Sequence, residues 1–197
     1  MSTDNELIER SRDEPGAFAM LFDRHATTVF RYAADRIGEH RAEDVMSETF
    51  LVAFERRSGY DLTVIDARPW LLGIATRLMR KHVRLEARAW KGMVADLSTM
   101  LAPDMIEQAG ARMDAARLAR RLASALRRLP AADRDALLLY AWGDLDYAGV
   151  AAALNVPVGT VRSRLNRARR RLRGAAGVSD TERETDDGRV DAAAQGA

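Results

Sequence analysis

The chain has 197 residues, which is enough for one domain or two small ones, and 47% of them are hydrophobic. The formal net charge is only +2, and the absence of cysteine excludes disulfides and thiolate zinc sites. No apolar run approaches the roughly 18 residues that a membrane-spanning helix needs. The polar N-terminus also lacks the apolar core of a secretory signal, so we expect a cytoplasmic protein without membrane insertion.

Charge is sorted along the chain rather than spread evenly. Segment 77–91 carries six cations and one acid, and segment 162–173 carries seven arginines and no acid. The end of the chain, 174–197, has six acids against two arginines. Two basic patches in a nearly neutral chain indicate a polyanionic partner.

The first elements follow from capping and breaking residues. Thr3 and Glu6 match a capping box, which begins a short helix that stops before Pro15. Pro15 suits the first turn of a long second helix, and Gly38 ends that helix. The apolar residues recur at helical spacing, and no convincing alternating strand is present.

Two further helices complete the N-terminal half. A third helix is predicted over 41–57, and a loop follows it at 58–61. Asp66 then caps a fourth helix, whose first turn tolerates a proline. We expect these four helices to pack into a bundle over residues 1–90.

The chain changes character after this bundle. Glycine and proline interrupt the periodicity over 91–113, which predicts an extended, mildly acidic linker. Helical periodicity resumes over 114–173, where Pro130 begins a new helix. The tail, 174–197, is acidic and rich in small residues, so we expect it to be disordered.

The most informative stretch lies at 155–173. A short apolar helix, a tight turn and an arginine-rich helix form a helix-turn-helix pattern. An apolar stripe on this last helix comprises Val161, Leu165, Ala168 and Leu172. The remaining faces carry arginines, whereas solvated helices usually mix both signs. A helix of this kind suits the major groove of duplex DNA.

The fourth helix is a second candidate for nucleic-acid binding. Its cations form a stripe, and Tyr60, Trp70 and Trp90 lie nearby in the sequence. Cations beside aromatic faces are typical of single-strand binding sites. Trp70 itself falls on the apolar stripe, so a core position is favoured for it.

The third helix carries acids next to an exposed leucine. Asp44, Glu48 and Glu55 form an acidic face with Leu51 between them at helical spacing, which suits a basic groove on a protein partner. A metal site is disfavoured because only His25 and His40 are near. No catalytic triad pattern or glycine-rich phosphate loop is present, so we expect no enzyme activity, no cofactor and no small-molecule substrate.

Two blocks of sequence resemble the extracytoplasmic-function group of the sigma-70 family of RNA polymerase sigma factors. Segments 42–50 (AEDVMSETF) and 67–75 (ARPWLLGIA) are similar to sigma region 2. Segment 126–165, from LRRLP to VGTVRSRL, is similar to region 4. The resemblance therefore extends over nearly the whole chain.

The resemblance implies binding roles for named residues. Asp44, Glu48 and Leu51 would bind core RNA polymerase. The loop at 58–66 would take a flipped base of the −10 promoter element. The residues implied for that opened strand are Tyr60, Asp61, Arg77, Arg80, Lys81 and Arg84. Those implied for the −35 duplex are Thr160, Arg162, Ser163, Arg164, Asn166, Arg167 and Arg169.

The resulting prediction is an all-α protein with two small helical domains, an N-terminal bundle and a C-terminal helix-turn-helix domain, joined by a flexible linker. The implied partners are core RNA polymerase, promoter DNA and an anti-sigma factor. The main alternative is a helix-turn-helix repressor or activator that acts without the polymerase. A helical adaptor that binds RNA is a further alternative, although the second domain lacks a single-strand module signature.

Overall fold

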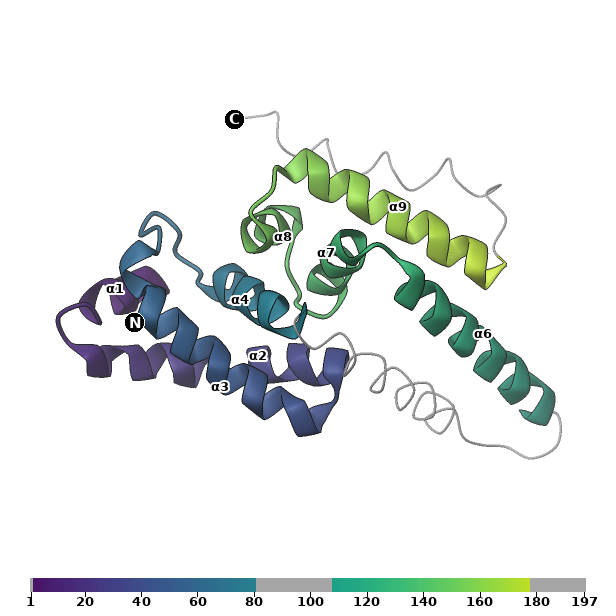
Figure 1. Cartoon of the computed structure of the whole chain (residues 1–197), viewed down its shortest axis with the longest axis horizontal. Helices are drawn as coiled ribbons and strands as arrows, with labels where there is room; N and C mark the ends of the chain where they lie inside the picture. Colours follow the sequence, from purple (N-terminus) through teal and green to yellow (C-terminus); the bar gives the residue numbers. More distant parts are fainter. Residues whose placement is uncertain (1, 81–107, 178–197) are drawn as a thin grey trace.

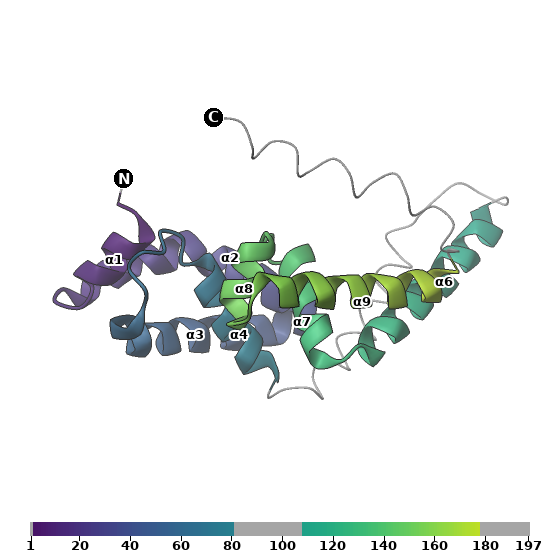
Figure 2. The same ribbon diagram turned by 90° about the horizontal axis from the view of Figure 1, so that it is seen from above.

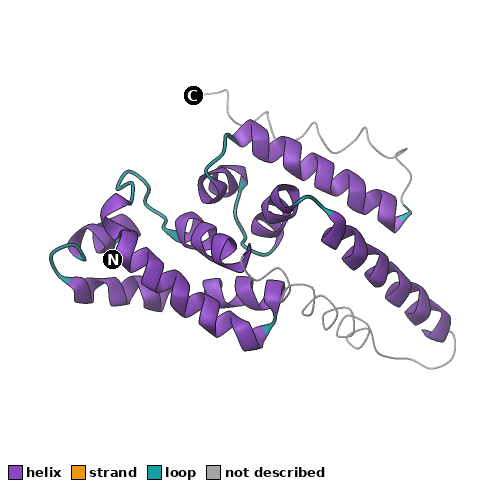
Figure 3. Cartoon of the chain, viewed as in Figure 1, coloured by secondary structure: helices purple, strands orange, loops and turns teal. Residues whose placement is uncertain are grey.

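The computed structural model describes residues 2–80 and 108–177, and helices with short connections account for nearly all of these residues (Figures 1 and 3). The all-α fold class is thereby confirmed. None of the helices in these two ranges is long and apolar enough to cross a membrane. In chain order the elements are α1 (Asp4–Arg10), η1 (Pro15–Phe18), α2 (Ala19–Ile37), α3 (Glu39–Arg56), η2 (Arg57–Gly59), α4 (Arg68–Arg80), α6 (Gln108–Arg128), α7 (Ala131–Ala141), α8 (Tyr147–Leu154) and α9 (Val158–Ala176).

The predicted capping residues delimit the N-terminal helices. The Thr3–Glu6 capping box forms at the start of α1. Pro15 begins the 3-10 turn η1, which leads directly into α2. Gly38 has φ of 87° and ψ of 152°, a backbone conformation that essentially only glycine adopts, and it separates α2 from α3. Asp66 accepts a hydrogen bond from the Arg68 amide at 2.8 Å, as expected of its capping position.

Helices α2, α3 and α4 bury the stripes that the sequence predicts. The buried members are Phe18, Leu21, Val29, Ala33, Ile37, Val45, Thr49, Phe50, Ala53, Leu71, Ile74 and Leu78. Trp70 is half-buried and packs against this core, in agreement with the position favoured from the sequence. Phe22 deviates from the pattern: it is partly exposed and meets Phe50 edge-on.

The C-terminal helices form the expected helix-turn-helix. Pro130 begins α7, and Asp146 caps α8 by accepting from the Gly149 amide at 2.7 Å. Asn155 adopts the left-handed conformation at φ 52°, which turns the chain sharply between α8 and α9. Figure 1 shows α9 lying alongside α6, with α7 and α8 between these two helices and the N-terminal half.

The helices α6 and α9 extend beyond the predicted domain limits. Helix α6 begins at Gln108, so residues 108–113, which the sequence assigns to the linker, are helical. Alanine, arginine and methionine favour helix there, and one glycine costs only about 1 kcal/mol. Helix α9 likewise runs to Ala176, past the predicted start of the tail. The remainder of the predicted linker and tail lies outside the described residues, and the domain boundaries stay a prediction.

The two halves are in contact through one apolar cluster. Buried residues from Ile8 through Met79 and from Ala136 through Leu165 belong to a single cluster. Helix α4 lies against α8, and Figure 2 shows α6 and α9 extending away from this junction. A Cβ at Gly73 would collide with the carbonyl oxygen of Ala153. Glycine at this position therefore lets the two helix backbones approach closely.

Three charged side chains lie buried or half-buried at the same junction. Asp135 of α7 pairs with Arg36 of α2, and both are completely buried. Its second oxygen accepts from Nε of Arg80 in α4 at 2.6 Å. Arg36 also donates to the Tyr32 hydroxyl at 3.1 Å, and that hydroxyl shares a hydrogen bond with Thr76 at 2.8 Å. Burial raises the Tyr32 pKa, while the Arg36 charge opposes that rise.

We expect the Asp135→Ala substitution to lower the free energy of unfolding by about 3–5 kcal/mol, because it removes the buried carboxylate that neutralises Arg36. Urea unfolding followed by circular dichroism measures the change. Asp23, which is exposed on α2, provides the matched control. An Asp135→Ala variant as stable as Asp23→Ala would show that the buried pair does not hold the halves together.

Candidate nucleic-acid and partner-binding surfaces

Helix α9 presents its polar residues to solvent on the side opposite the core. Val161, Leu165 and Ala168 are fully buried, as their spacing predicts, and Leu172 is half-buried. Three of the predicted duplex-binding side chains are exposed on the other side: Arg162, Ser163 and Asn166. These three residues form the α9 face. Thr160 and Arg164 are half-buried beside it.

Two other predicted duplex-binding residues make internal contacts. Arg167 donates to both oxygens of Asp133, from Nη2 at 2.8 Å and from Nε at 3.1 Å. The hydrogen bond to Asp133 raises the Arg167 pKa. Arg169 donates to the Tyr147 hydroxyl at 3.2 Å and lies over the Tyr140 ring at 5.2 Å. Of the four predicted arginines, Arg162 is thus exposed and Arg164 half-buried, while Arg167 and Arg169 are held by neighbouring side chains.

Two carboxylates on α7, those of Asp133 and Asp135, bind arginines of other helices, and the sequence analysis did not select them as functional candidates. Asp133 and Asp135 are buried, and residues two apart on a helix point in nearly opposite directions. Asp133 therefore reaches α9, and Asp135 reaches α2 and α4. The available signal was a pair of acids directly before a run of leucines, which is an unusual place for solvated carboxylates.

Helix α4 exposes two cations of the predicted single-strand stripe. Arg77 is exposed, and partial burial together with the charges of Arg56 and Arg80 lowers its pKa. Arg80 is half-exposed, but its guanidinium is engaged by Asp135. Lys81 and Arg84, the other two members of the prediction, lie outside the described residues.

The segment between η2 and α4, residues 60–67, is here called the entry loop. Asp61 accepts from the Thr63 amide at 3.0 Å and from the Thr63 hydroxyl at 2.7 Å, and these bonds lower its pKa. The Val64 amide donates to the Asp61 carbonyl at 3.0 Å. Two apolar side chains that the sequence reasoning did not select, Val64 and Ile65, are exposed, and Ile65 has 63% of its surface accessible.

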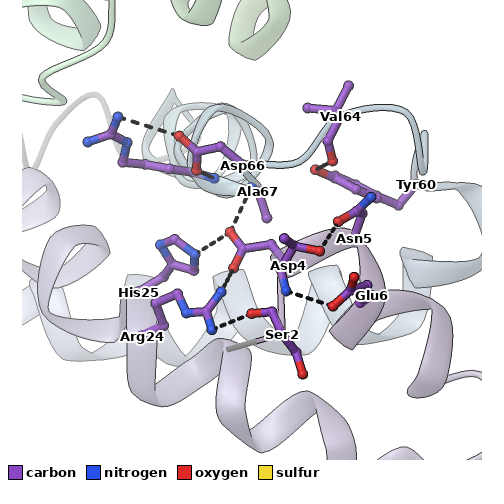
Figure 4. Close-up of polar contacts among 12 residues, drawn as sticks. Ser2, Asp4, Asn5, Glu6, Arg24, His25, Tyr60, Val64, Asp66 and Ala67 are labelled. Carbon is purple, nitrogen blue, oxygen red and sulfur yellow. Dashed lines mark hydrogen bonds and ion pairs between the residues drawn. The ribbon is translucent and has the colours of Figure 1, made fainter.

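Tyr60 occupies a different position from the one that its predicted role requires. Only 8% of the residue is exposed, and its ring packs on Trp70 with centroids 4.9 Å apart. Its hydroxyl donates to the Val64 carbonyl at 2.9 Å, as Figure 4 shows. Burial, with added repulsion from Asp4 and Asp66, raises the Tyr60 pKa. Because the ring is covered, Tyr60 supports the entry loop from inside and does not offer a stacking surface for a base.

The acidic side of α3 has the geometry that its spacing predicts. Asp44, Glu48 and Leu51 are all exposed and follow each other at intervals of four and three residues. They form the α3 face. Leu51 has 58% of its surface accessible, a high value for a leucine flanked by carboxylates. Such an arrangement can bind a basic groove that has an apolar centre.

One cluster of potential metal ligands lies at the N-terminal end, where Asp4, His25 and Asp66 approach within 4.8 Å. Asp4 already pairs with Arg24, accepts from Nε2 of His25 at 2.6 Å and accepts from the Ala67 amide at 2.9 Å (Figure 4). A guanidinium beside the carboxylate opposes cation binding by charge repulsion. The cluster is therefore a set of polar contacts that joins α1, α2 and the entry loop.

These surfaces can be compared with known families. A model described as Sigma-70 region 2 matches residues 21–89, and one described as Sigma-70, region 4 matches residues 119–172. The ECF RNA polymerase sigma factor SigE of Mycolicibacterium smegmatis is 32% identical over 188 residues, which cover 87% of this chain and 71% of SigE.

Two solved structures share the fold. CnrH, in complex with the cytosolic domain of CnrY, superimposes with a TM-score of 0.60 at 24% identity, covering 89% of this chain and 98% of CnrH. The sigma factor RpoE from Bartonella quintana, in complex with the anti-sigma factor NepR, has a TM-score of 0.53 at 20% identity and covers 82% of this chain and 98% of RpoE.

The Asp4 carboxyl makes the stability of the fold depend on pH. Its burial alone would raise the pKa, but hydrogen bonds from His25 and the Ala67 amide, the His25 charge and the Arg24 bond lower it from 3.8 to about 2. A group with a depressed folded-state pKa contributes stability that is present above the unfolded pKa and is lost as the pH falls through the folded pKa.

We therefore expect the stability difference between wild type and Asp4→Asn to narrow on acidification, by about 1 kcal/mol at about pH 3. Urea unfolding at a series of pH values measures it. The exposed Asp23→Asn serves as control and should show a difference that does not narrow in this way. A constant difference for Asp4→Asn would mean that its carboxylate is not selectively stabilised in the folded chain.

Proposed function

This chain belongs to the extracytoplasmic-function group of the sigma-70 family, and from that membership we propose which of its surfaces bind core RNA polymerase, the opened promoter strand and the −35 duplex. A factor of this family recognises promoters. The alternatives of a regulator that acts without the polymerase and of an RNA-binding adaptor are set aside, because neither accounts for a region 2 match followed by a region 4 match. The chain acts by binding and not by catalysis.

The α9 face binds the −35 duplex. The observation that carries this assignment is the exposure of Arg162, Ser163 and Asn166 near the N-terminal end of the second helix of a helix-turn-helix. Residues at this end of a recognition helix lie deepest in the major groove. Arg162 is suited to a bidentate contact with a guanine edge, and phosphate contacts from other arginines supply affinity without base specificity.

Arg167 acts from a fixed position. Its bidentate pairing with Asp133 orients the guanidinium, while 46% of the side chain stays accessible. An arginine held in this way can contact the duplex without first losing rotamer entropy. Arg169 lies over the Tyr140 ring and is assigned to support α9 near the phosphates of the duplex. Thr160 and Arg164, at the edge of the α9 face, are assigned to the backbone of the same duplex.

The opened strand of the −10 element is bound by the entry loop and by α4. The exposed Val64 and Ile65 provide apolar contacts for an unstacked base, and Asp61 provides an acceptor. Arg77 neutralises phosphates of the DNA backbone, and Arg80 does the same once it is released from Asp135. Lys81 and Arg84 continue the same stripe in the sequence. Flipping a base costs a few kcal/mol, so stable capture needs the polymerase channel as well.

The α3 face binds core RNA polymerase through Asp44, Glu48 and Leu51. Its exposed leucine between carboxylates is the supporting feature. We further propose an anti-sigma factor as the regulator of this chain, by analogy with RpoE, which was solved together with NepR. Such a protein would compete for these binding surfaces.

Replacing Leu51 by alanine should weaken the binding of core polymerase by about tenfold or more, because an exposed apolar anchor is lost from the centre of the interface. Surface plasmon resonance with immobilised core enzyme measures the affinity. Glu43→Ala, an exposed acid on another side of α3, is the matched control. Equal affinities for both variants would remove α3 from the polymerase interface.

Replacing Arg162 by alanine should reduce initiation from promoters with a matching −35 element by about tenfold, and much less from promoters with a scrambled one. In vitro transcription with core polymerase, on promoters that this sigma factor selects from a randomised library, provides the measurement. Arg173→Ala, which removes an exposed arginine from the far end of α9, should lower initiation similarly on both templates. If Arg162→Ala behaves like Arg173→Ala, the α9 face does not read bases.

A further inference from the structure

The first helix contacts the entry loop at two points. Nδ2 of Asn5 donates to the Leu62 carbonyl at 2.9 Å. The adjacent Asp4 accepts from the Ala67 amide, also at 2.9 Å. Two consecutive residues of α1 thus bind the loop near its middle and at its end, across 57 and 63 residues of sequence. Figure 4 shows Asp4 and Asn5 next to the loop residues Tyr60 and Ala67.

Helix α1 is itself firmly anchored, so it does not simply follow the loop. Leu7 and Ile8 are completely buried. Arg24 of α2 pairs with Asp4 and donates to the Ser2 carbonyl at 2.9 Å. These contacts attach α1 to α2 independently of the entry loop. The helix can therefore serve as a fixed support for a segment that is not itself helical.

The side chain of Asn5 is oriented by a neighbour. The Thr3 hydroxyl donates to Oδ1 of Asn5, so the oxygen of this side-chain amide has a hydrogen-bond partner. The nitrogen is thereby directed to the Leu62 carbonyl. Because Thr3 is also the capping residue of α1, the start of the helix and the loop contact are set by the same residues.

We infer that α1 is a positioning element for base capture: Asp4 and Asn5 fix the entry loop in the shape that receives an unstacked base, without touching the DNA. This inference rests on the role proposed above for the entry loop. It adds that discrimination between bases at the −10 element depends on the N-terminal helix.

The physical basis is the cost of ordering a loop. Fixing the backbone of one residue costs about 1–2 kcal/mol, and a loop that becomes ordered only on binding subtracts this cost from its affinity. Asp61, Tyr60 and α1 supply the order in advance. Pre-ordering also maintains selectivity, since a loose loop can adjust to the wrong base.

Asn5→Ala tests only the support that α1 gives to the entry loop, because it removes the hydrogen bond to the Leu62 carbonyl and leaves the buried Asp4 cluster intact. Hydrogen–deuterium exchange on the full chain should show faster exchange of the 60–67 peptide, by about 2- to 10-fold, the factor expected for one hydrogen bond. Peptides from α4 and α9 should be unchanged. Glu9→Ala, an exposed residue of α1, is the control and should match wild type. Unchanged exchange in Asn5→Ala would overturn the inference.

Base discrimination provides the second readout, measured as the ratio of initiation on promoters that differ in one −10 base, with full chain and core polymerase. Asn5→Ala should reduce this ratio by about 2- to 10-fold while core affinity stays at the wild-type value. A lower rate on every promoter with an unchanged ratio would indicate a merely structural role and overturn the inference. If wild type and Ile65→Ala show the same ratio, the proposed role of the loop fails instead, whatever the exchange data show.

Discussion

A buried carboxylate shared by two arginines is the interaction on which the arrangement of the two halves depends. Asp135 and Arg36 are completely buried, and a buried charge is strongly destabilising unless it is paired. The pair can be buried only when α7 lies against α2 and α4. Apolar side chains would tolerate small shifts at this junction, whereas the pair requires one relative position. The close approach at Gly73 and Ala153 depends on that same position.

Helix α7 connects the two proposed DNA-binding surfaces through its acids. Asp133 holds Arg167 of the duplex-binding helix, and Asp135 holds Arg80 of the single-strand stripe. A guanidinium cannot make bidentate bonds to a carboxylate and to a phosphate with the same nitrogens. Bidentate strand binding by Arg80 through Nε and Nη2 therefore has to displace a buried acid, which then needs Arg36 as its remaining partner. Arg80 is bound to Asp135 in the free protein, so the exposed Arg77 is the more accessible of these two arginines for a DNA phosphate.

Local patterns predicted the helices well, because periodicity and capping depend on neighbours in the sequence. The capping roles of Thr3 and Asp66 and the buried stripe of α9 follow from residues at most four positions apart. Contacts between distant residues were not predictable in this way. The partners of Asp135 lie 99 and 55 residues away, and nothing local distinguishes its carboxylate from a solvated one. The burial of Tyr60 was not predictable for a related reason, since it depends on Trp70 of the next helix.

Some of the groups assigned to DNA binding are held in place before DNA binds, and others are free. Asp133 orients Arg167 and α1 supports the entry loop, whereas Arg162, which is assigned to a base edge, is exposed. Contacts with phosphates tolerate variable geometry, and the arginines suited to them, such as Arg170 and Arg173, extend into solvent. Restraint costs side-chain entropy in the free protein, where the fold compensates it, so less remains to be lost when DNA binds. Asp133, whose charge by itself opposes DNA binding, thus also prepares Arg167 for its contact with DNA.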